Sequence, residues 1–286
     1  PAEKNADPLA QVDPRSLPAL DLRIATLLQG DAPLGRVAFK LRPSERGLRA
    51  SELDLDLRGL KIGGEVGWDV SAGGAQRSWY RGRLQGDDLG RILIAWGYAP
   101  TASSESFRLD ADASWPGSPA ERLSGTLNAS MRKGQFSEVQ GGASALRVFG
   151  LLNFNAIGRR LRLDFSDLFG RGLSYDRVSG AITVRDGVYS SAPLSMTGPS
   201  AGLEFSGRLD LPRDRIDGRL QVSLPLTNNL PLAALIAGAP AIGGALFVVD
   251  KLLGDRVARF ASVEYEVSGS TQSPQITYGK PVESAR

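Results

Sequence analysis

The chain of 286 residues contains neither cysteine nor histidine. The absence of cysteine excludes a disulfide framework and thiolate-bound metals, and is compatible with an oxidising or a reducing compartment. The absence of histidine excludes a Ser-His-Asp triad, a Cys-His dyad and a His-ligated zinc. An enzyme would be left with carboxylate pairs, lysine or tyrosine chemistry, or oxygen-ligated metals. The sequence also contains no phosphate-binding loop and no glycine-rich dinucleotide motif, and we expect a protein that is not an enzyme and that uses no cofactor and no metal.

Concentrated positive charge is also lacking. The 34 basic residues are almost balanced by 31 acidic ones, so the net charge is only +3. The longest basic cluster is Arg159 and Arg160 with Arg162, which is too short for the basic patch of a nucleic-acid-binding protein. This cluster is either a surface group near a turn or a grip on lipid phosphates. We expect no nucleic-acid partner.

The N-terminal residues carry no charged-then-apolar signal sequence, so we expect that targeting information has been removed or never existed. Residues 1–18 are polar and contain Pro8, Pro14 and Pro18, a composition typical of a tether or a poorly ordered lead-in. We expect a β-rich segment over residues 19–142 and a second segment over residues 143–286.

Alternation of apolar and polar residues dominates residues 20–115 and returns after residue 180, which is typical of half-buried β-strands. Short turn signals such as Gly63-Gly64, Gly73-Gly74 and Asp186-Gly187 separate the runs and predict antiparallel hairpins. The inward positions of these strands are expected to line one apolar surface, with Leu55, Leu109, Ile182, Val184, Leu209 and Val222 among its residues.

Two carboxylate pairs at spacing i, i+2 share one face of a strand: Asp54 with Asp56, and Asp110 with Asp112. They could form an acid/base pair or a calcium site. The simpler interpretation, which we prefer, is that they belong to the polar faces of amphipathic strands.

A few short helices are expected to interrupt the sheet. Asp88 is a suitable N-cap for a helix with Leu89, Ile92, Leu93 and Trp96 on one face, and Ser144 for another. The third helical region, residues 229–254, lies in a stretch without charge from Leu220 to Val249. Pro240 and Gly243-Gly244 interrupt it, which favours an apolar helical hairpin over a straight membrane span. This hairpin is expected to lie in a groove of the sheet or in lipid, through Leu232, Leu235, Ile236, Ile242, Leu246 and Phe247.

Two long blocks carry a resemblance to a known family. Residues 145–176, which begin Ala-Leu-Arg-Val-Phe-Gly, and residues 224–260, which begin Leu-Pro-Leu-Thr-Asn-Asn, resemble the C-terminal region of YhdP-type proteins. These belong to the AsmA-like family of Gram-negative envelope proteins, which also includes TamB. The resemblance covers roughly residues 145–280, and residues 1–144 share only the strand pattern.

This resemblance implies a periplasmic protein held in the inner membrane by an N-terminal helix that is absent from this sequence. It also implies a bridge-like lipid-transfer groove that carries phospholipid to the outer membrane, with an outer-membrane or periplasmic protein as a further partner. We therefore expect a mainly β fold with an open, strongly curved antiparallel sheet. The alternative is a scaffold or assembly factor for outer-membrane proteins that pairs client strands at an exposed sheet edge. A continuous apolar face would favour the lipid hypothesis over the scaffold.

Overall fold

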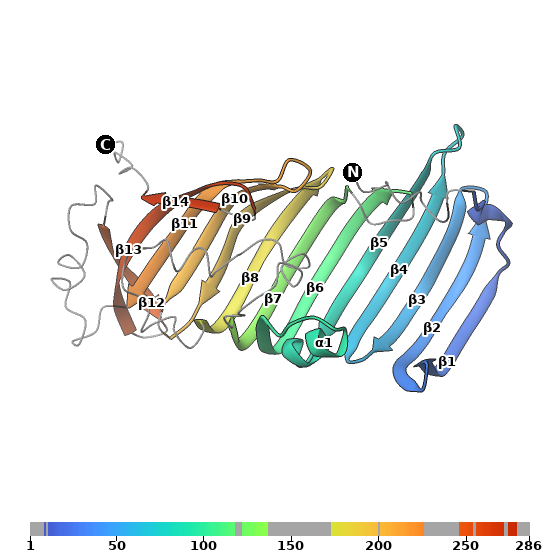
Figure 1. The fold of residues 1–286 in the computed structure, drawn as a ribbon, viewed down its shortest axis with the longest axis horizontal. Helices are drawn as coiled ribbons and strands as arrows, with labels where there is room; N and C mark the ends of the chain where they lie inside the picture. The colour runs from blue at the N-terminus through green and yellow to red at the C-terminus, as the bar shows by residue number, and fades with distance from the viewer. Residues whose placement is uncertain are drawn as a thin grey trace. The chain divides into compact units, whose positions relative to one another are not determined.

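The computed structural model describes Leu9 and residues 11–117, 122–136, 173–199, 201–225, 246–253, 256–271 and 274–278. Almost all of these residues lie in strands, so the protein is mainly β as predicted (Figure 1). The first elements are the 3-10 helix η1 and the strands and helix that follow it: η1 Pro14–Ser16, β1 Leu20–Gln29, β2 Ala32–Ser44, β3 Gly47–Leu57, β4 Leu60–Val70, β5 Gln76–Gly86, α1 Leu89–Ala95 and β6 Ala102–Pro116. The remaining elements are all strands: β7 Ser124–Phe136, β8 Leu173–Arg185, β9 Val188–Thr197, β10 Gly202–Asp210, β11 Arg215–Pro225, β12 Leu246–Leu253, β13 Arg256–Gly269 and β14 Pro274–Tyr278.

The strands form one open sheet of 14 strands. Its order is β1-β2-β3-β4-β5-β6-β7-β8-β9-β10-β11-β13-β12, and β14 pairs with β13 beside this path. Neighbours from β1 to β6 pair antiparallel, as do β10, β11, β13 and β12 in their order. Most neighbours are also consecutive in the sequence, since short turns join them. The predicted open antiparallel sheet of hairpins is confirmed.

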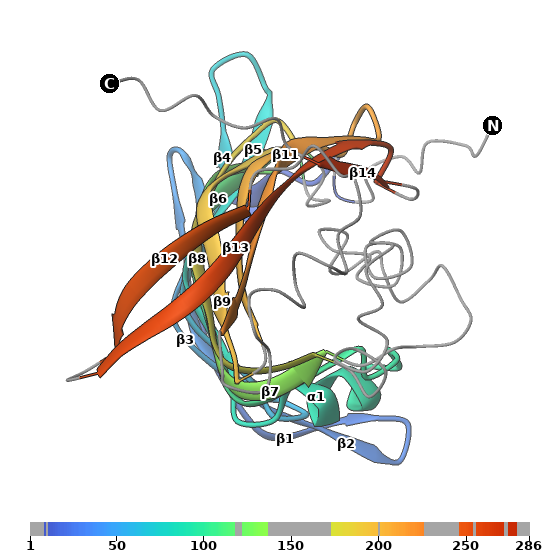
Figure 2. The ribbon, with the colours of Figure 1, turned by 90° about the vertical axis from the view of Figure 1, so that its left-hand side faces the viewer.

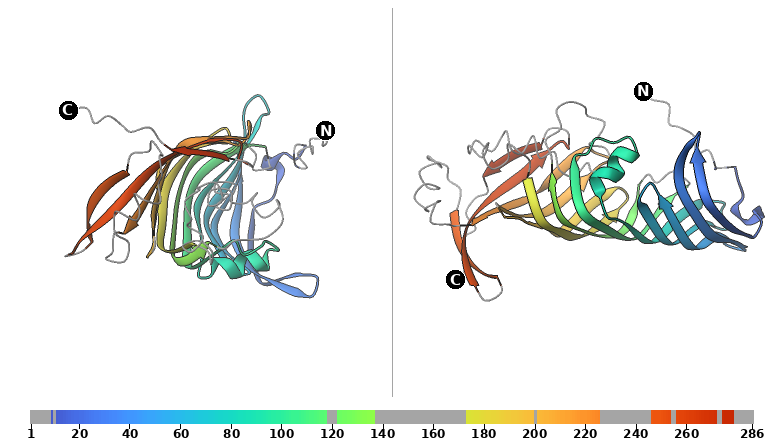
Figure 3. Two further views of the ribbon diagram at one scale, coloured as in Figure 1. Left: turned by 60° about the vertical axis from the view of Figure 1, so that its left-hand side comes forward. Right: turned by 90° about the horizontal axis from the view of Figure 1, so that it is seen from below.

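The chain divides into two compact units. The first consists of Pro1–Tyr98, Ser104–Met131 and Ala181–Tyr189, and the second of Ala99–Ser103, Arg132–Gly180 and Ser190–Arg286. In the first unit the strands β1 to β5 lie side by side as successive hairpins (Figure 3).

One predicted turn lies elsewhere. Gly63 and Gly64 are inside β4, and the β3–β4 turn is formed by Arg58 and Gly59. Gly64 sits at an irregularity of the β3–β4 register and has a φ of +122°, and a Cβ added to it would lie 2.2 Å from the carbonyl oxygen of Arg81. Glycine is therefore required at position 64 by its positive φ beside a bulge of β3 and by the close approach of β5. In the sequence, the resulting Gly-Gly pair resembles a turn signal.

The helix predicted after Asp88 is confirmed. The Asp88 carboxylate accepts a hydrogen bond from the backbone N–H of Arg91 at 3.0 Å, which caps the N-terminus of α1. Leu89, Ile92 and Leu93 are buried. Within the described residues, α1 is the one α-helix, and none of these residues belongs to a helix that is long and apolar enough to span a membrane.

The C-terminal helical hairpin needs correction. Leu246–Leu253, which the sequence placed in its second helix, form β12 and pair antiparallel with β13. Phe247, Val248 and Val249 are aromatic or β-branched residues, which favour a strand once a partner strand is available. Residues 226–245 and the helix expected after Ser144 lie outside the described residues.

Candidate functional site

The strand register divides the first unit into two chemically different faces. Cross-strand partners lie on the same face, so the pairs can be followed from strand to strand. Val37 pairs with Leu55, Leu55 with Ile62, and Ile62 with Leu84. Leu84 in turn pairs with Leu109 on β6. One face of β2 to β6 therefore carries an unbroken apolar row, which we call the apolar face.

Further rows make this face continuous along the strands. Its other large side chains are Leu22, Ile24, Phe39, Leu41, Leu48, Leu53, Leu57, Leu60, Val66, Trp68, Tyr80, Phe107 and Trp115. Nearly all of these side chains are half-buried, as are Leu55 and Leu109, so each keeps apolar surface that is accessible to a ligand. The structure thus places two of the predicted groove residues, Leu55 and Leu109, on one shared face.

Helix α1 covers one end of the apolar face. A Cβ added to Gly86, which pairs with Phe107 on this face, would lie 2.5 Å from Cδ1 of Ile92 and 2.7 Å from Cε1 of Phe107. Figure 2 shows α1 on one side of the strands of this unit. The helix reaches the sheet because glycine at position 86 leaves room for the side chain of Ile92.

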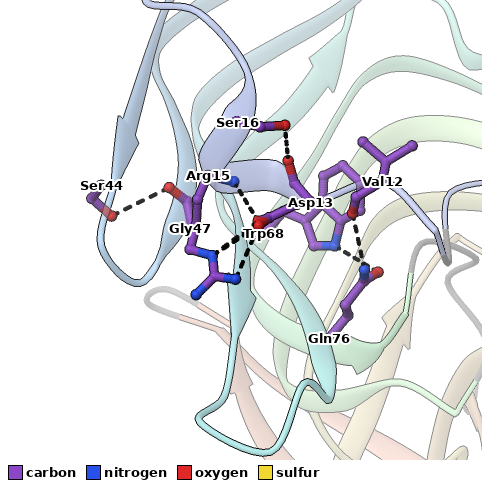
Figure 4. A network of polar contacts seen from close by, with 8 residues as sticks. All are labelled: Val12, Asp13, Arg15, Ser16, Ser44, Gly47, Trp68 and Gln76. Atoms are coloured by element: carbon purple, nitrogen blue, oxygen red, sulfur yellow. Dashed lines mark hydrogen bonds and ion pairs between the residues drawn. The ribbon is translucent and has the colours of Figure 1, made fainter.

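The N-terminal segment lies over the opposite end of the strands. The Nε2 of Gln76 donates to the carbonyl oxygen of Val12 at 3.1 Å, and the Nε1 of Trp68 donates to Oε1 of Gln76 at 3.2 Å (Figure 4). Asp13 accepts hydrogen bonds from the backbone and the guanidinium of Arg15, which lowers the pKa of Asp13. Residues 1–18 were expected to form a tether or a poorly ordered lead-in. Within them, the carbonyl oxygen of Val12 accepts a hydrogen bond from Gln76 on the apolar face.

The opposite face of the first unit is charged. Ion pairs link neighbouring strands across it: Arg42 with Asp21, Arg36 with Asp54, Lys40 with Glu52, Arg49 with Glu65, Arg83 with Asp110, and Arg81 with Asp112. Hydrogen bonds from Arg108 and Arg83 lower the pKa of Asp110. We call this the polar face. Exposed ion pairs contribute little to stability, so their main effects are to fix the register and keep this face in water.

Two tryptophans mark the two faces at adjacent positions of β4 and β5. Trp68 pairs with Ser78 on the apolar face, while Trp79 pairs with Gly67 on the polar face. Trp79 lies against Gly67, its Nε1 donates to Asp69 at 2.9 Å, and the guanidinium of Arg81 lies 5.2 Å from its ring centre. Cation–π contact of this kind holds an aromatic side chain on a charged surface.

Aromatic side chains cover glycine pairs on the apolar side of each unit. Gly82 pairs with Gly64, and a Cβ added to Gly82 would lie 2.0 Å from the carbonyl oxygen of Gly63 and 2.6 Å from the hydroxyl of Tyr80. That hydroxyl donates to the carbonyl oxygen of Gly63 at 2.8 Å. Burial, followed by the Asp110 carboxylate, raises the pKa of Tyr80, so the phenol is neutral at physiological pH.

The second unit repeats this arrangement. Gly207 pairs with Gly218, and a Cβ added to either glycine would lie 3.0 Å or 2.8 Å from Cζ of Phe205. In both units the covering aromatic residue lies two positions before one glycine of the pair, as in Tyr80-Arg81-Gly82 and Phe205-Ser206-Gly207. The sequence contained this signal, but strand alternation alone did not single it out.

The remaining predicted groove residues are buried. Leu209 pairs with Ile216, and Val222 pairs with Leu203, on one face of the second unit. Leu209 is 2% exposed and Val222 is 5% exposed. Ile182 and Val184 on β8 are buried as well. These four side chains therefore pack in the structure, whereas Leu55 and Leu109 keep accessible surface.

The other predicted contact residues divide by position. Leu232, Leu235, Ile236 and Ile242 lie outside the described residues, and Leu246 and Phe247 lie on β12. The carboxylates Asp54, Asp110 and Asp112 each form an ion pair on the polar face, in agreement with the simpler interpretation of their spacing. Among the residues that the structure describes, no cluster of acidic side chains could hold a metal ion.

Three comparisons relate the chain to known proteins. The family model described as YhdP protein matches residues 1–276. The protein of Escherichia coli (strain K12) named "Intermembrane phospholipid transporter YhdP" is 28% identical over 211 residues, which cover 72% of this chain and 17% of that protein. The chain therefore corresponds to a small part of that relative's length. No solved structure matches the chain.

Proposed function

The chain belongs to the YhdP family, and from this premise we propose that it is a section of a lipid-transfer protein whose apolar face shields phospholipid acyl chains. In this proposal the sheet is strongly curved and the apolar face is the floor of a groove. The chains lie on Leu55, Leu109 and their neighbours, while the headgroups stay in water.

The observation that carries this proposal is the half-buried state of the apolar face. A sheet face that only completes a core would bury its apolar side chains, as Leu209 and Val222 are buried in the second unit. The first unit instead leaves Leu53, Leu55 and Ile62 only partly buried. Contiguous exposed apolar surface of this kind marks a ligand or partner site. An acyl chain would gain about 0.8 kcal/mol for each CH2 group that it buries there.

The chemistry of the two faces supports an extended track for lipid rather than a catalytic pocket. Ionisable side chains of the first unit gather on the polar face in cross-strand pairs. The apolar face offers no directed hydrogen bonds along its row from Val37 to Leu109. Such a surface binds chains without fixing their position, so a lipid can slide along it. No site chemistry is needed for this function.

In the cell, we propose that the protein acts in the periplasm as part of a longer chain anchored in the inner membrane by an N-terminal helix. Phospholipid would travel toward the outer membrane, with an outer-membrane or periplasmic protein as a partner. The residues from Leu232 to Phe247 would contact the groove or the outer membrane. The name of the E. coli relative, an intermembrane phospholipid transporter, supports the choice of phospholipid as cargo.

The scaffold hypothesis requires a filled core and a client strand at an exposed edge. The continuous apolar face of the first unit favours lipid over such a client.

The test uses the two tryptophans on opposite faces. Two variants are prepared, each keeping one tryptophan, Trp68 or Trp79, with the other three replaced by phenylalanine. Each is mixed with phospholipid whose acyl chains carry bromine, which quenches tryptophan fluorescence only at short range.

We expect quenching of Trp68, which lies on the apolar face, and none of Trp79, which lies on the polar face. Equal quenching of both, or quenching of Trp79 alone, would contradict the proposal. Unbrominated lipid serves as the control for changes in fluorescence that have another cause.

A further inference from the structure

A second feature of the first unit lies where the apolar face ends. Arg58 and Gly59 form the two-residue turn between β3 and β4, directly after Leu57 and before Leu60, which pair on the apolar face. Both turn residues have positive φ, +51° for Arg58 and +86° for Gly59. Turns with two positive φ values prefer asparagine, aspartate or glycine at the first position. An arginine held in this strained conformation indicates a role for its side chain beyond the turn.

The side chain of Arg58 is positioned by two other segments. Its Nη1 donates to the carbonyl oxygen of Ala95 at 2.5 Å, and its Nη2 donates to Oε1 of Gln29 at 2.9 Å. Ala95 ends helix α1, and Gln29 ends β1. Because α1 lies on the apolar side of the sheet, these bonds draw the guanidinium toward that side. Arg58 is half-buried as a result.

The contacts of Arg58 offset its charge only in part, through the partial negative charge at the C-terminus of α1. Both acceptors are neutral, whereas the arginines of the polar face, such as Arg36 and Arg83, pair with carboxylates. In the part of the chain described by the structure, no carboxylate forms an ion pair with Arg58. A guanidinium has five N–H donors. Two are used here, so three remain for an anion.

Exposed apolar and aromatic side chains lie next to Ala95 in the sequence. Trp96 directly follows Ala95 and is 38% exposed, and Ile94 and Tyr98 are exposed as well. Tryptophan and tyrosine favour boundaries where an apolar region meets a polar one. The end of the apolar face thus combines exposed aromatic residues with a fixed arginine that forms no ion pair with a carboxylate of the described residues.

We propose that Arg58 binds the phosphate group of a phospholipid whose acyl chains lie on the apolar face. The guanidinium forms charged hydrogen bonds to the phosphate oxygens, and Trp96 contacts the boundary between headgroup and chains. Arginine suits this role because its planar donors match two phosphate oxygens at once. The inference rests on the proposed function, because it requires acyl chains on the apolar face.

The test compares two fluorescent lipids with the same acyl chains, phosphatidylglycerol and diacylglycerol, which differ in the phosphate headgroup. The affinity ratio of the two lipids is the phosphate preference of the protein. We expect a clear preference in the wild-type chain. Arg58→Gln should reduce it about tenfold, which is about 1.4 kcal/mol, without changing the affinity for diacylglycerol. Arg58→Lys keeps the charge but loses the planar pair of donors, so it should retain only part of the preference.

Arg23→Gln is the matched control, because Arg23 lies on the polar face of β1 opposite Ala38. It removes the same charge and should leave the preference unchanged. An unchanged preference in Arg58→Gln would overturn the inference but leave the proposed function intact. Equal losses for both lipids, with a lower melting temperature, would make Arg58 a brace between turns and would also overturn it.

Inorganic phosphate separates the two sources of the anion. We expect millimolar phosphate to leave the bound phosphatidylglycerol in place, because acyl chains hold the lipid. Displacement by phosphate would assign Arg58 to free phosphate and would overturn the headgroup inference. If the wild-type chain binds neither fluorescent lipid, the proposed function itself fails, and this inference fails with it.

Discussion

Glutamine in place of Leu55 or of its neighbour Asp54 offers a direct comparison of the two faces, because the same new side chain is placed on opposite sides of β3. Leu55 pairs with Val37 and Ile62 on the apolar face, while Asp54 pairs with Ala38 and Gly63 on the polar face. The two positions are adjacent in sequence, so differences in local backbone structure are small. The proposed function predicts a large effect of Leu55→Gln on lipid binding and a small effect of Asp54→Gln.

The magnitude follows from the exposure of each side chain. A fully buried leucine contributes about 1.5–3 kcal/mol, and Leu55 is half-buried, so about 1 kcal/mol remains to be gained from an acyl chain. Placing the glutamine amide against the chain adds a desolvation cost of about 1 kcal/mol. Together these predict that lipid binding by Leu55→Gln weakens about thirtyfold. Asp54→Gln loses only an exposed ion pair with Arg36, which is about 0–1 kcal/mol of stability and no lipid contact.

Equilibrium titration with fluorescent phospholipid measures the two affinities, and far-UV circular dichroism with thermal melting checks that both variants keep the sheet. Similar affinities for the two variants would refute the assignment of the faces. Normal binding by Leu55→Gln would refute the proposal that acyl chains lie on this row.

Three further predictions concern stability. Gly82→Ala should lower the free energy of unfolding by about 2 kcal/mol or more, because the new Cβ would meet a carbonyl oxygen at 2.0 Å. Gly73→Ala, in an exposed turn with its nearest neighbour at 4.0 Å, should melt like the wild type. Ser223→Ala or Ser262→Ala should each cost about 1–3 kcal/mol in chemical denaturation, because each leaves a buried hydroxyl without its 2.8 Å partner. The double variant should recover most of this loss, and an additive double loss would contradict the pairing. The Asp110 carboxylate has a lowered pKa in the fold, so its stabilisation is complete above its unfolded pKa and is lost as pH falls through the folded value. Asp110→Asn should therefore flatten the acid limb of a stability–pH curve, and an unchanged limb would argue against this contribution.

Local periodicity determined much of what the sequence predicted correctly. Alternation along β3 and β6 placed Leu55 and Leu109 on a common type of face, because successive side chains of a strand point to opposite sides whatever the partner strand. The cap at Asp88 was equally readable, since capping requires only a side-chain oxygen next to the first helical turn. The mainly β, hairpin-built sheet follows from these local rules.

Pairing between strands decided what local periodicity could not. Gly64 is a turn signal by composition, yet the register of β3 on β4 places it inside β4, beside a bulge of β3. Leu246–Leu253 are apolar enough for a helix, but an antiparallel partner, β13, makes them a strand. The solvent exposure of a side chain also depends on segments that are distant in the sequence. Leu55 and Leu209 share the same alternation, yet one is half-buried and the other is 2% exposed.

The position of Arg58 shows the same limit most clearly. In the sequence, Arg58 is an arginine before a glycine, and nothing distinguishes it from the other basic residues among the 34 of the chain. The structure shows that Gln29 and Ala95, far away in the sequence, accept its hydrogen bonds, and that no carboxylate in the described residues pairs with it. Side-chain spacing along the chain thus determined the two faces of the sheet. Contacts between segments distant in sequence decided which parts of those faces are open to a ligand, because burial and charge compensation depend on the neighbours that folding supplies.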